Sequence, residues 1–161
     1  MTIDVIDKKG FRKNVCIVMT NNLDKVFFAR RSTDKGWQFP QGGVLLGETY
    51  RQAMYRELFE EVGLTEKDVT IIGITDRLYF YKLPKAYVNH HKKPLCIGQK
   101  QKWYLLKLKS SEQEINLNAS AQPEFDSFKW INYWDTINEV VDFKKEVYRS
   151  ALRHLERIRA H

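Results

Sequence analysis

Residues 42–64 read GGVLLGETYRQAMYRELFEEVGL, and this stretch decides the fold. It begins with two glycines, the residues that follow have the periodicity of an α-helix, and Gly63 is placed to end that helix. Apolar residues recur at intervals of four and would face a core: Met54, Leu58 and Val62. We therefore expect a helix over residues 49–62 that is buried along this stripe.

The same stretch gathers carboxylates on one side of the expected helix. At 100° per residue, Glu57, Glu60 and Glu61 share an arc of about 100°. Like charges at this spacing repel one another, and their hard oxygen atoms suit Mg²⁺ or Mn²⁺, which would relieve the repulsion. The Gly42-Gly43 pair would let backbone approach the same cation. A metal site is one interpretation of this stretch, and a solvated glutamate-rich helix after a glycine turn is the other.

Basic residues gather in a second stretch. The chain has 161 residues, with 27 Lys+Arg against 20 Asp+Glu and a net charge of +7. Residues 77–111 hold nine of the basic residues, no acidic residue and six interleaved aromatic residues. This mixture is typical of phosphate contacts combined with base stacking, and it predicts a path for RNA. The alternative is that the lysines form only the solvated face of a strand.

The composition is that of one globular domain over residues 1–161. The chain is 43% hydrophobic and 29% charged, which is typical of a folded protein. Cys16 and Cys96 are too few for a disulfide scaffold. The N-terminus lacks the pattern of a signal peptide, and no apolar run approaches the ~20 residues of a membrane span. We therefore expect a cytoplasmic protein that does not enter a membrane.

Further apolar segments predict strands around two helices. Residues 15–19 and 26–30 would form a hairpin. More strands are expected over residues 69–74, 77–83, 102–109 and 125–131. A second helix is expected over residues 137–159, with an apolar stripe made of Val140, Phe143, Val147, Ala151, Leu155 and Ile158. The pattern predicts an α/β fold in which a mixed sheet lies between helices.

Residues 42–64 also match every fixed position of the Nudix box, G-x5-E-x7-R-E-U-x-E-E-x-G-U, where U is aliphatic. Segments outside the box resemble the bacterial RNA pyrophosphohydrolases, a subgroup of the Nudix hydrolases related to dinucleoside polyphosphate hydrolases. These segments are residues 10–12, 29–31, 37–43, 81–84, 97–103, 123–125 and 143–144. The resemblance covers nearly the whole chain and implies the Nudix fold.

This resemblance implies a metal-dependent hydrolysis at the 5′ end of RNA. Pyrophosphate, or phosphate from a 5′-diphosphate, would be removed to leave a 5′-monophosphate, which starts mRNA decay. Such a displacement requires neutralised phosphate charges and a water molecule aligned opposite the leaving group. The implied cofactor is Mg²⁺, with Mn²⁺ as the alternative, and the implied partner is 5′-phosphorylated RNA.

The resemblance also implies roles for the acidic residues. The expected metal ligands are Glu57, Glu60, Glu61 and the backbone of Gly42, and Glu57 would also polarise the water. Arg56 would pair with Glu48 and orient it without taking part in the chemistry. Outside the box, Glu124 is expected as a further ligand or general base. The alternative for Glu124 is a carboxylate on a surface turn.

Cations, an amide and aromatic rings are expected to hold the phosphates and the first nucleotides. The candidates are Arg12, Arg31, Gln41, Lys100, Lys102 and Lys144, with Tyr81 and Phe143 as residues that contact or stack on bases. Because an aromatic face accepts any base, we expect weak discrimination between bases. The adjacent His90 and His91 lie in a lysine-rich segment, so we expect a loop there and no metal ligands.

Three functions remain open at this point. The first is an RNA 5′ pyrophosphohydrolase, and the second is a diadenosine tetra- or pentaphosphate hydrolase, which needs no extended RNA path. The third is a non-catalytic module that binds RNA or nucleotides. The acid-free stretch favours RNA, and a complete set of carboxylates without a metal would be costly, which disfavours the third function.

Overall fold

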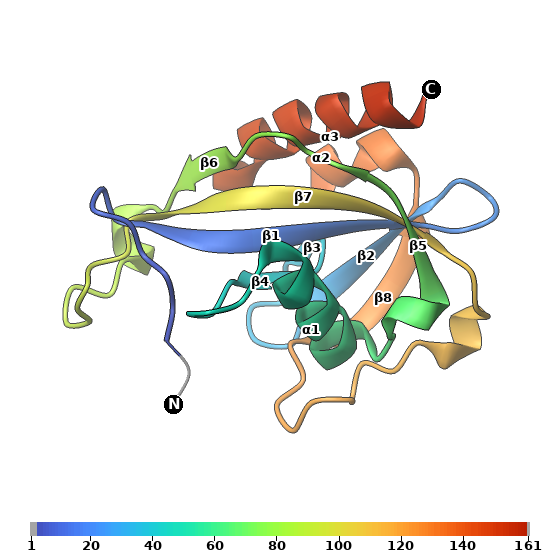
Figure 1. The fold of residues 1–161 in the computed structure, drawn as a ribbon, viewed down its shortest axis with the longest axis horizontal. Coiled ribbons are helices and arrows are strands. Elements are labelled where there is room, and N and C mark those ends of the chain that lie inside the picture. Colours follow the sequence, from blue (N-terminus) through green and yellow to red (C-terminus); the bar gives the residue numbers. More distant parts are fainter. Residues whose placement is uncertain (1–2, 161) are drawn as a thin grey trace.

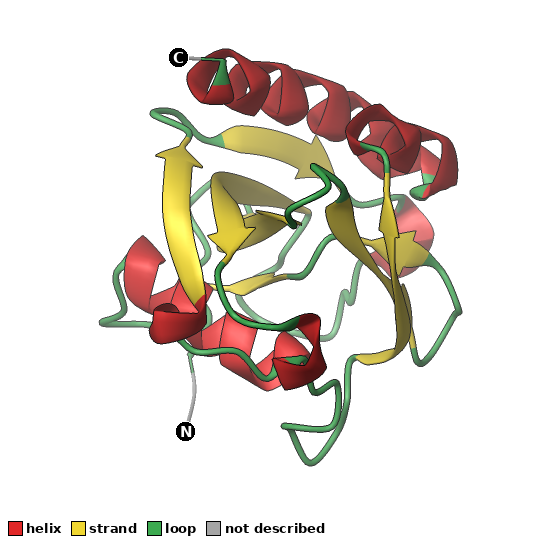
Figure 2. Ribbon diagram, turned by 90° about the vertical axis from the view of Figure 1, so that its right-hand side faces the viewer, coloured by secondary structure: helices red, strands yellow, loops and turns green. Residues whose placement is uncertain are grey.

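The structure, a computed structural model, describes residues 3–160. Within this range the strands form one mixed sheet, with α1 over one face and α3 over the other (Figures 1 and 2). The strands are β1 (Phe11–Thr20), β2 (Val26–Arg31), β3 (Trp37–Gln38), β4 (Gln41–Gly43), β5 (Val69–Ile74), β6 (Tyr79–Lys82), β7 (Gly98–Leu108) and β8 (Phe125–Ile131), and the helices are α1 (Tyr50–Val62), α2 (Thr136–Glu139) and α3 (Lys145–Arg159). The predicted sheet between helices is confirmed. None of the helices described is long and apolar enough to cross a membrane.

The centre of the sheet is a parallel pair of long strands. β1 and β7 pair along their lengths, from Phe11 opposite Gly98 to Thr20 opposite Lys107. β5 and β6 add to β7 in antiparallel orientation, and β8 pairs with β2. In this register, odd-numbered side chains of β1 share one face of the sheet with even-numbered side chains of β7, and the remaining side chains of the two strands share the other face.

The strands β1 and β2 diverge, and this opening creates the place for a site. Their pairing is limited to Thr20 opposite Val26, so the predicted hairpin is joined only near its turn. The opening is filled by residues 37–43, because β3 pairs with β2 and β4 pairs with β1. This pairing sets Gly42 opposite Val15. The two short strands were not predicted from the sequence.

The sheet separates two apolar layers. On β1, Val15, Ile17 and Met19 belong to the layer under α1, whereas Cys16 and Val18 belong to the layer under α3. On α1 the predicted stripe of Met54, Leu58 and Val62 is fully buried. Each such side chain contributes about 1.5–3 kcal/mol when it leaves water. Burial of this stripe fixes which face of α1 turns away from the core.

The ends of α1 follow the sequence prediction closely. Thr49 caps the N-terminus, where its side chain accepts a hydrogen bond of 3.1 Å from the backbone N–H of Gln52. Gly63 ends the helix in the left-handed region, at φ 78°. A Cβ at Gly63 would lie 2.7 Å from the carbonyl oxygen of Asn116, so glycine is required there both for its conformation and for space.

The prediction of one helix over residues 137–159 is wrong. α2 ends at Glu139, Val140 and Val141 are extended, a 3₁₀ turn covers Asp142–Lys144, and α3 begins at Lys145. Adjacent β-branched valines favour extended backbone over helix, which accounts for the position of the break. The break takes residues 141–144 out of the helical line and places them beside the opening between β1 and β2.

Candidate active site

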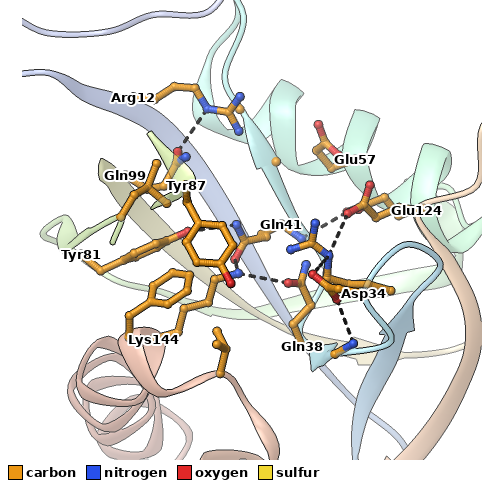
Figure 3. Close-up of a pocket in the computed structure, with 18 of the residues that line it drawn as sticks. Arg12, Asp34, Gln38, Gln41, Glu57, Tyr81, Tyr87, Gln99, Glu124 and Lys144 are labelled. Carbon is orange, nitrogen blue, oxygen red and sulfur yellow. Dashed lines mark hydrogen bonds and ion pairs between the residues drawn. The ribbon is translucent and has the colours of Figure 1, made fainter. Parts of the chain in front are cut away.

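A cavity of about 730 Å³ lies beside the opening between β1 and β2 (Figure 3). Residues from the N-terminal segment, the sheet, α1 and the break before α3 line it. The lining includes these residues expected from the sequence: Arg12, Arg31, Gln41, Gly42, Arg56, Glu57, Glu61, Tyr81, Glu124, Phe143 and Lys144. Residues that are up to 140 positions apart in the sequence, from Asp4 to Lys144, thus line one cavity.

The acidic wall of this cavity consists of Glu57, Glu61 and Glu124. Glu57 and Glu61 lie one turn apart on α1 and are buried, at 9% and 5% exposure, whereas Glu124 is exposed. The backbone N–H of Gln41 donates to Glu61 Oε1 at 3.1 Å. Glu124 is held through its carbonyl oxygen, which accepts a 2.8 Å hydrogen bond from the N–H of Ser32. Figure 3 shows Glu57 and Glu124 on the same side of the cavity.

The protonation of the acidic wall is strongly perturbed. Burial raises the pKa of Glu57 to about 7, although Arg56 acts in the opposite direction. Burial raises the pKa of Glu61 well above its usual value, and the charges of Glu57 and Glu124 raise it further. Ionising both carboxylates at neutral pH is therefore costly without additional positive charge beside them. A hard divalent cation would supply that charge, so the chemistry of these oxygen donors suits a metal such as Mg²⁺.

Arg56 ties the acidic wall to the backbone of β4. It donates to Glu48 at 2.7 and 3.1 Å, to Glu57 at 2.8 Å and to the carbonyl oxygen of Gly43 at 2.7 Å. The pair of Arg56 and Glu48 expected from the sequence is therefore present. With both partners largely covered, the pair positions α1 against the Gly42-Gly43 backbone.

Glu60 does not line the cavity. Its side chain is 47% exposed, and Arg56 Nη1 donates to Glu60 Oε2 at 3.3 Å. Among residues 3–160, no group of three or more His, Cys, Asp or Glu side chains is close enough to hold a metal ion. The helical arc expected from the sequence is present, but Arg56 bridges two of its carboxylates, Glu57 and Glu60, and holds them in ion pairs.

Gly42 allows the backbone to approach Glu57 closely. A Cβ at Gly42 would lie 2.0 Å from Cδ of Glu57 and 2.1 Å from one of its carboxylate oxygens. Any other residue would displace this carboxylate. The close approach expected from the glycine pair is thus present, and it is directed at a residue of the acidic wall.

The opposite side of the cavity, here called the aromatic wall, consists of Tyr81, Tyr87 and Phe143. The ring of Phe143 lies between the other two, with centroids 6.0 Å from Tyr81 and 5.5 Å from Tyr87. Burial raises the pKa of Tyr81 to about 12, so its hydroxyl stays protonated, and it accepts a hydrogen bond from Gln41 Nε2 at 3.3 Å. Tyr87 is one of the six aromatic residues of the basic stretch that the sequence associated with base stacking, although it was not named as a site residue, and it contributes an exposed ring.

Lys144 lies buried beside the aromatic wall, at 4% exposure. Its ammonium group donates to Gln38 Oε1 at 3.0 Å and to Gln41 Oε1 at 3.4 Å. Burial lowers the pKa of Lys144 to about 8, and the charge of Arg31 lowers it further. Gln38 was not singled out in the sequence, because nothing in the local pattern separates it from an ordinary strand residue.

Arg31 has an unpaired polar atom at the cavity. Its Nε is buried without a hydrogen bond, 3.6 Å from Asp34 Oδ2 and 3.8 Å from Glu124 Oε1. A buried N–H without an acceptor is costly, and an oxygen atom of an anionic ligand would satisfy it. Arg31 therefore suits a phosphate next to the acidic wall.

Arg12 is positioned by an amide on β7. Its Nε donates to Gln99 Oε1 at 3.1 Å, and the same oxygen accepts from Asn14 Nδ2 at 3.2 Å. Its Nη1 donates to Asp4 Oδ2 at 3.3 Å. Neither Gln99 nor Asp4 was expected from the sequence, since both contacts depend on the pairing of distant segments.

Lys100 and Lys102 lie outside the residues that line the cavity. Lys100 Nζ donates to Asp7 Oδ2 at 2.9 Å, and Lys102 Nζ lies 5.4 Å from the ring centre of Tyr50 on α1. The reason is strand alternation, because Gln99 and Gln101 face the cavity side and the two lysines between and after them face the other side. His90 and His91 are exposed.

Comparison with known proteins places this site in a family. The model of the NUDIX domain matches residues 10–151. An RNA pyrophosphohydrolase from Legionella pneumophila is 55% identical over 152 residues, which cover 94% of this chain and 87% of that protein. A protein of the same name from Francisella philomiragia is 53% identical over 152 residues, which cover 94% of this chain and 97% of that protein.

A solved structure agrees in fold. The E. coli dihydroneopterin triphosphate pyrophosphohydrolase is 21% identical, with a TM-score of 0.70, and the match covers 88% of this chain and 94% of that chain. This similarity concerns the fold alone. Together with the family model and the relatives of higher identity, it establishes that the chain belongs to the NUDIX domain family.

Proposed function

We propose that this chain is an RNA 5′ pyrophosphohydrolase that works with a divalent metal ion. The observation that carries the proposal is a single cavity with buried carboxylates on one side and aromatic rings with cations on the other. A phosphorylated 5′ end of RNA offers partners for both sides, since it joins a chain of phosphates to stacked bases. Relatives that are 53–55% identical and carry the name RNA pyrophosphohydrolase support the same assignment.

The metal would be held by the carboxylates of α1 and by residues beside them. Glu57, Glu60, Glu61 and Glu124 would supply carboxylate oxygens, and Gly42 would supply its backbone. Mg²⁺, with Mn²⁺ as the alternative, would neutralise phosphate charge and polarise a phosphoryl oxygen when it is bound. Glu60 would have to exchange its ion pair with Arg56 for the metal.

The chain's own groups would perform the remaining tasks. A water molecule attacks phosphorus, the phosphoanhydride bond breaks, and the proton of the water passes to a carboxylate of the acidic wall. Glu57 suits this task because its carboxylate lines the cavity directly against the Gly42 backbone. Arg31 and Lys144 donate to phosphate oxygens, and Arg12 adds a third cation at the cavity.

The aromatic wall would bind the first nucleotides. Tyr81 and Phe143 offer ring faces, and a base gains about 1–3 kcal/mol by stacking on such a face, whatever its identity. The hydrolysis leaves a 5′-monophosphate, the product that starts mRNA decay, and we place this reaction in the cytoplasm.

A comparison of two substrates tests the proposal. In Mg²⁺, kcat/KM is measured for an RNA oligonucleotide with a 5′-triphosphate and for diadenosine tetraphosphate. We expect a preference for RNA, release of pyrophosphate and no turnover after chelation of the metal. A preference for the dinucleotide by orders of magnitude would overturn the RNA assignment. RNA binding without turnover of either substrate would instead identify a non-catalytic module.

A further inference from the structure

One part of the basic stretch, the segment between β6 and β7, reaches the cavity and has not been assigned a role above. After β6 ends at Lys82, the chain makes a 3₁₀ turn over Lys85–Tyr87 and a loop that returns to β7. Tyr87 lines the cavity, and Lys92 Nζ lies 3.6 Å from Asp4 Oδ2 at the cavity rim. This segment thus borders the site, whereas Lys100 and Lys102 on the following strand do not.

Tyr87 presents a free ring face at the end of the aromatic wall. The Tyr87 ring contacts Phe143, with ring centroids 5.5 Å apart and ring planes inclined at 43°, and Tyr87 is still 62% exposed. The 3₁₀ turn fixes its backbone through a 2.8 Å hydrogen bond from the N–H of Tyr87 to the carbonyl oxygen of Pro84. Figure 3 shows this ring on the opposite side of the cavity from Glu57 and Glu124. A base that reached it would therefore lie away from the reacting phosphates.

The carboxylate of Asp4 lies between two cations, Arg12 and Lys92. Its Oδ2 accepts from Arg12 Nη1 at 3.3 Å and lies 3.6 Å from Lys92 Nζ. Arg12 is also held by Gln99, so its guanidinium stays in place when Asp4 leaves. A phosphodiester oxygen carries the same charge and accepts the same hydrogen bonds as a carboxylate oxygen. The gap now filled by Asp4 therefore fits a backbone phosphate.

We propose that Tyr87 and the pair of Arg12 and Lys92 form a subsite for RNA downstream of the reacting end. A base stacks on the free face of Tyr87, and a phosphodiester replaces Asp4 between Arg12 and Lys92. The ligand class is single-stranded polynucleotide, since a dinucleoside polyphosphate contains no phosphodiester between nucleosides. This inference rests on the proposed function and adds the part of the substrate beyond its 5′ phosphates.

Binding of a product-like RNA tests the subsite without turnover. The probe is a fluorescent single-stranded RNA of about ten nucleotides with a 5′-monophosphate, and its Kd is measured by anisotropy across a series of salt concentrations. We expect Tyr87→Ala to raise Kd about 10-fold. Tyr87→Phe keeps the ring and should therefore retain the wild-type Kd. Lys92→Ala should reduce the slope of log Kd against log salt by about 0.7, because one phosphate contact is lost.

Two further variants complete the test. Asp4→Asn removes the competing charge and should lower Kd, and Lys109→Ala, an exposed lysine at the far end of the basic stretch, should leave the slope unchanged. Equal Kd values for Tyr87→Ala and the wild type, or an unchanged slope for Lys92→Ala, would overturn the subsite. These results are distinguishable from failure of the proposed function, which would show as absence of turnover of triphosphorylated RNA by the wild type. Thermal melting checks that each variant is folded.

Discussion

Two of the three carboxylates of the acidic wall, Glu57 and Glu61, come from neighbouring turns of one helix, whereas the three rings of the aromatic wall come from three separate segments. Glu57 and Glu61 are buried and tied to Arg56 and β4 by short polar contacts. The rings of the aromatic wall meet at 5.5 to 6.0 Å, and their outermost member is exposed. The acidic wall performs the chemistry through a few carboxylates, so one substitution there should reduce activity strongly. The aromatic wall divides recognition of RNA among several rings, so one substitution there should reduce activity less.

The largest effect is expected from Glu57→Gln in the acidic wall. This change keeps the size of the side chain but removes the charge and the proton acceptor. We expect kcat for triphosphorylated RNA to fall about 10³-fold, within the range of lost acid–base catalysis. Thermal melting should show a folded protein. Turnover within 10-fold of the wild type would contradict the place of Glu57 at the centre of the chemistry.

The same variant should remove a pH effect on stability. The folded pKa of Glu57 is raised from 4.5 to about 7, so the folded state binds more protons than the unfolded state between these values. Without metal, stability should therefore fall as pH rises from about 4.5 through 7, and Glu57→Gln should weaken this fall. Mg²⁺ should raise the melting temperature more at pH 8 than at pH 5.5, because it binds the ionised carboxylates. An increase that does not depend on pH would contradict this assignment.

The next effect is expected from Gly42→Ala, which changes no charge. The new Cβ would fall 2.0 Å from Cδ of Glu57, the far end of a flexible side chain, so the carboxylate moves while the fold persists. We expect kcat/KM to fall about 10- to 100-fold, as for a lost positioning contact, with little change in melting temperature.

A second glycine provides the control for Gly42→Ala. At Gly47 nothing lies within 4 Å of an added Cβ, but φ is +85°. Gly47→Ala should therefore cost about 1–2 kcal/mol of stability through backbone strain and leave activity near the wild-type value. Equal losses of activity in the two variants would show that the close approach of Gly42 to Glu57 is not what matters.

These two walls also differ in how far the sequence could predict them. The spacing of Glu57 and Glu61 follows from helical period, and Gly63 marks the helix end, so α1 could be predicted from local sequence alone. Predicting the aromatic wall would have required locating the break at Val140 and Val141, which is hidden by an apolar stripe that continues through it. Its other parts depend on which distant strands pair, and no local pattern of residues contains that information.

The β7 strand shows the same limit at the level of single side chains. Charge pointed to Lys100 and Lys102 as contacts for phosphate, yet the register with β1 turns Gln99 and Gln101 toward the cavity. Strand alternation could have grouped the glutamines together and the lysines together. Which of the two groups faces the site depends on where β1 and β2 diverge, and that follows from the fold as a whole.

A smaller effect is expected from Lys144→Met beside the aromatic wall. The change removes a cation near the phosphates. It also removes the hydrogen bonds that Lys144 donates to the side-chain oxygens of Gln38 and Gln41, so kcat/KM should fall about 10-fold. In the wild type, kcat/KM should decline as pH rises through about 8, where Lys144 loses its proton, and this decline should be absent in Lys144→Met. A profile that declines equally in both proteins would assign the alkaline limb to another group.

The linkage of Lys144 to stability has the opposite sign to that of Glu57. Its folded pKa is lowered from 10.5 to about 8, so the unfolded state binds more protons between these values. Stability should therefore gain from Lys144 as pH rises from 8 to 10.5, and this gain should be missing in Lys144→Met. Urea unfolding at several pH values measures it.

The smallest effect is expected from Lys100→Ala, on the face of β7 that turns away from both walls. Lys100 donates to Asp7 at 2.9 Å and is separated from the cavity by strand alternation. We expect kcat/KM for RNA to change less than about 2-fold and its salt dependence to stay the same, because a lost phosphate contact would reduce the slope by about 0.7. The pKa of Asp7, held at about 2 by the N–H of Phe11 and by Lys100, should rise in an NMR titration. A reduced slope would mean that Lys100 exchanges Asp7 for RNA, as Lys92 is proposed to exchange Asp4, and the RNA path would then continue from the rim of the aromatic wall onto the other face of the sheet.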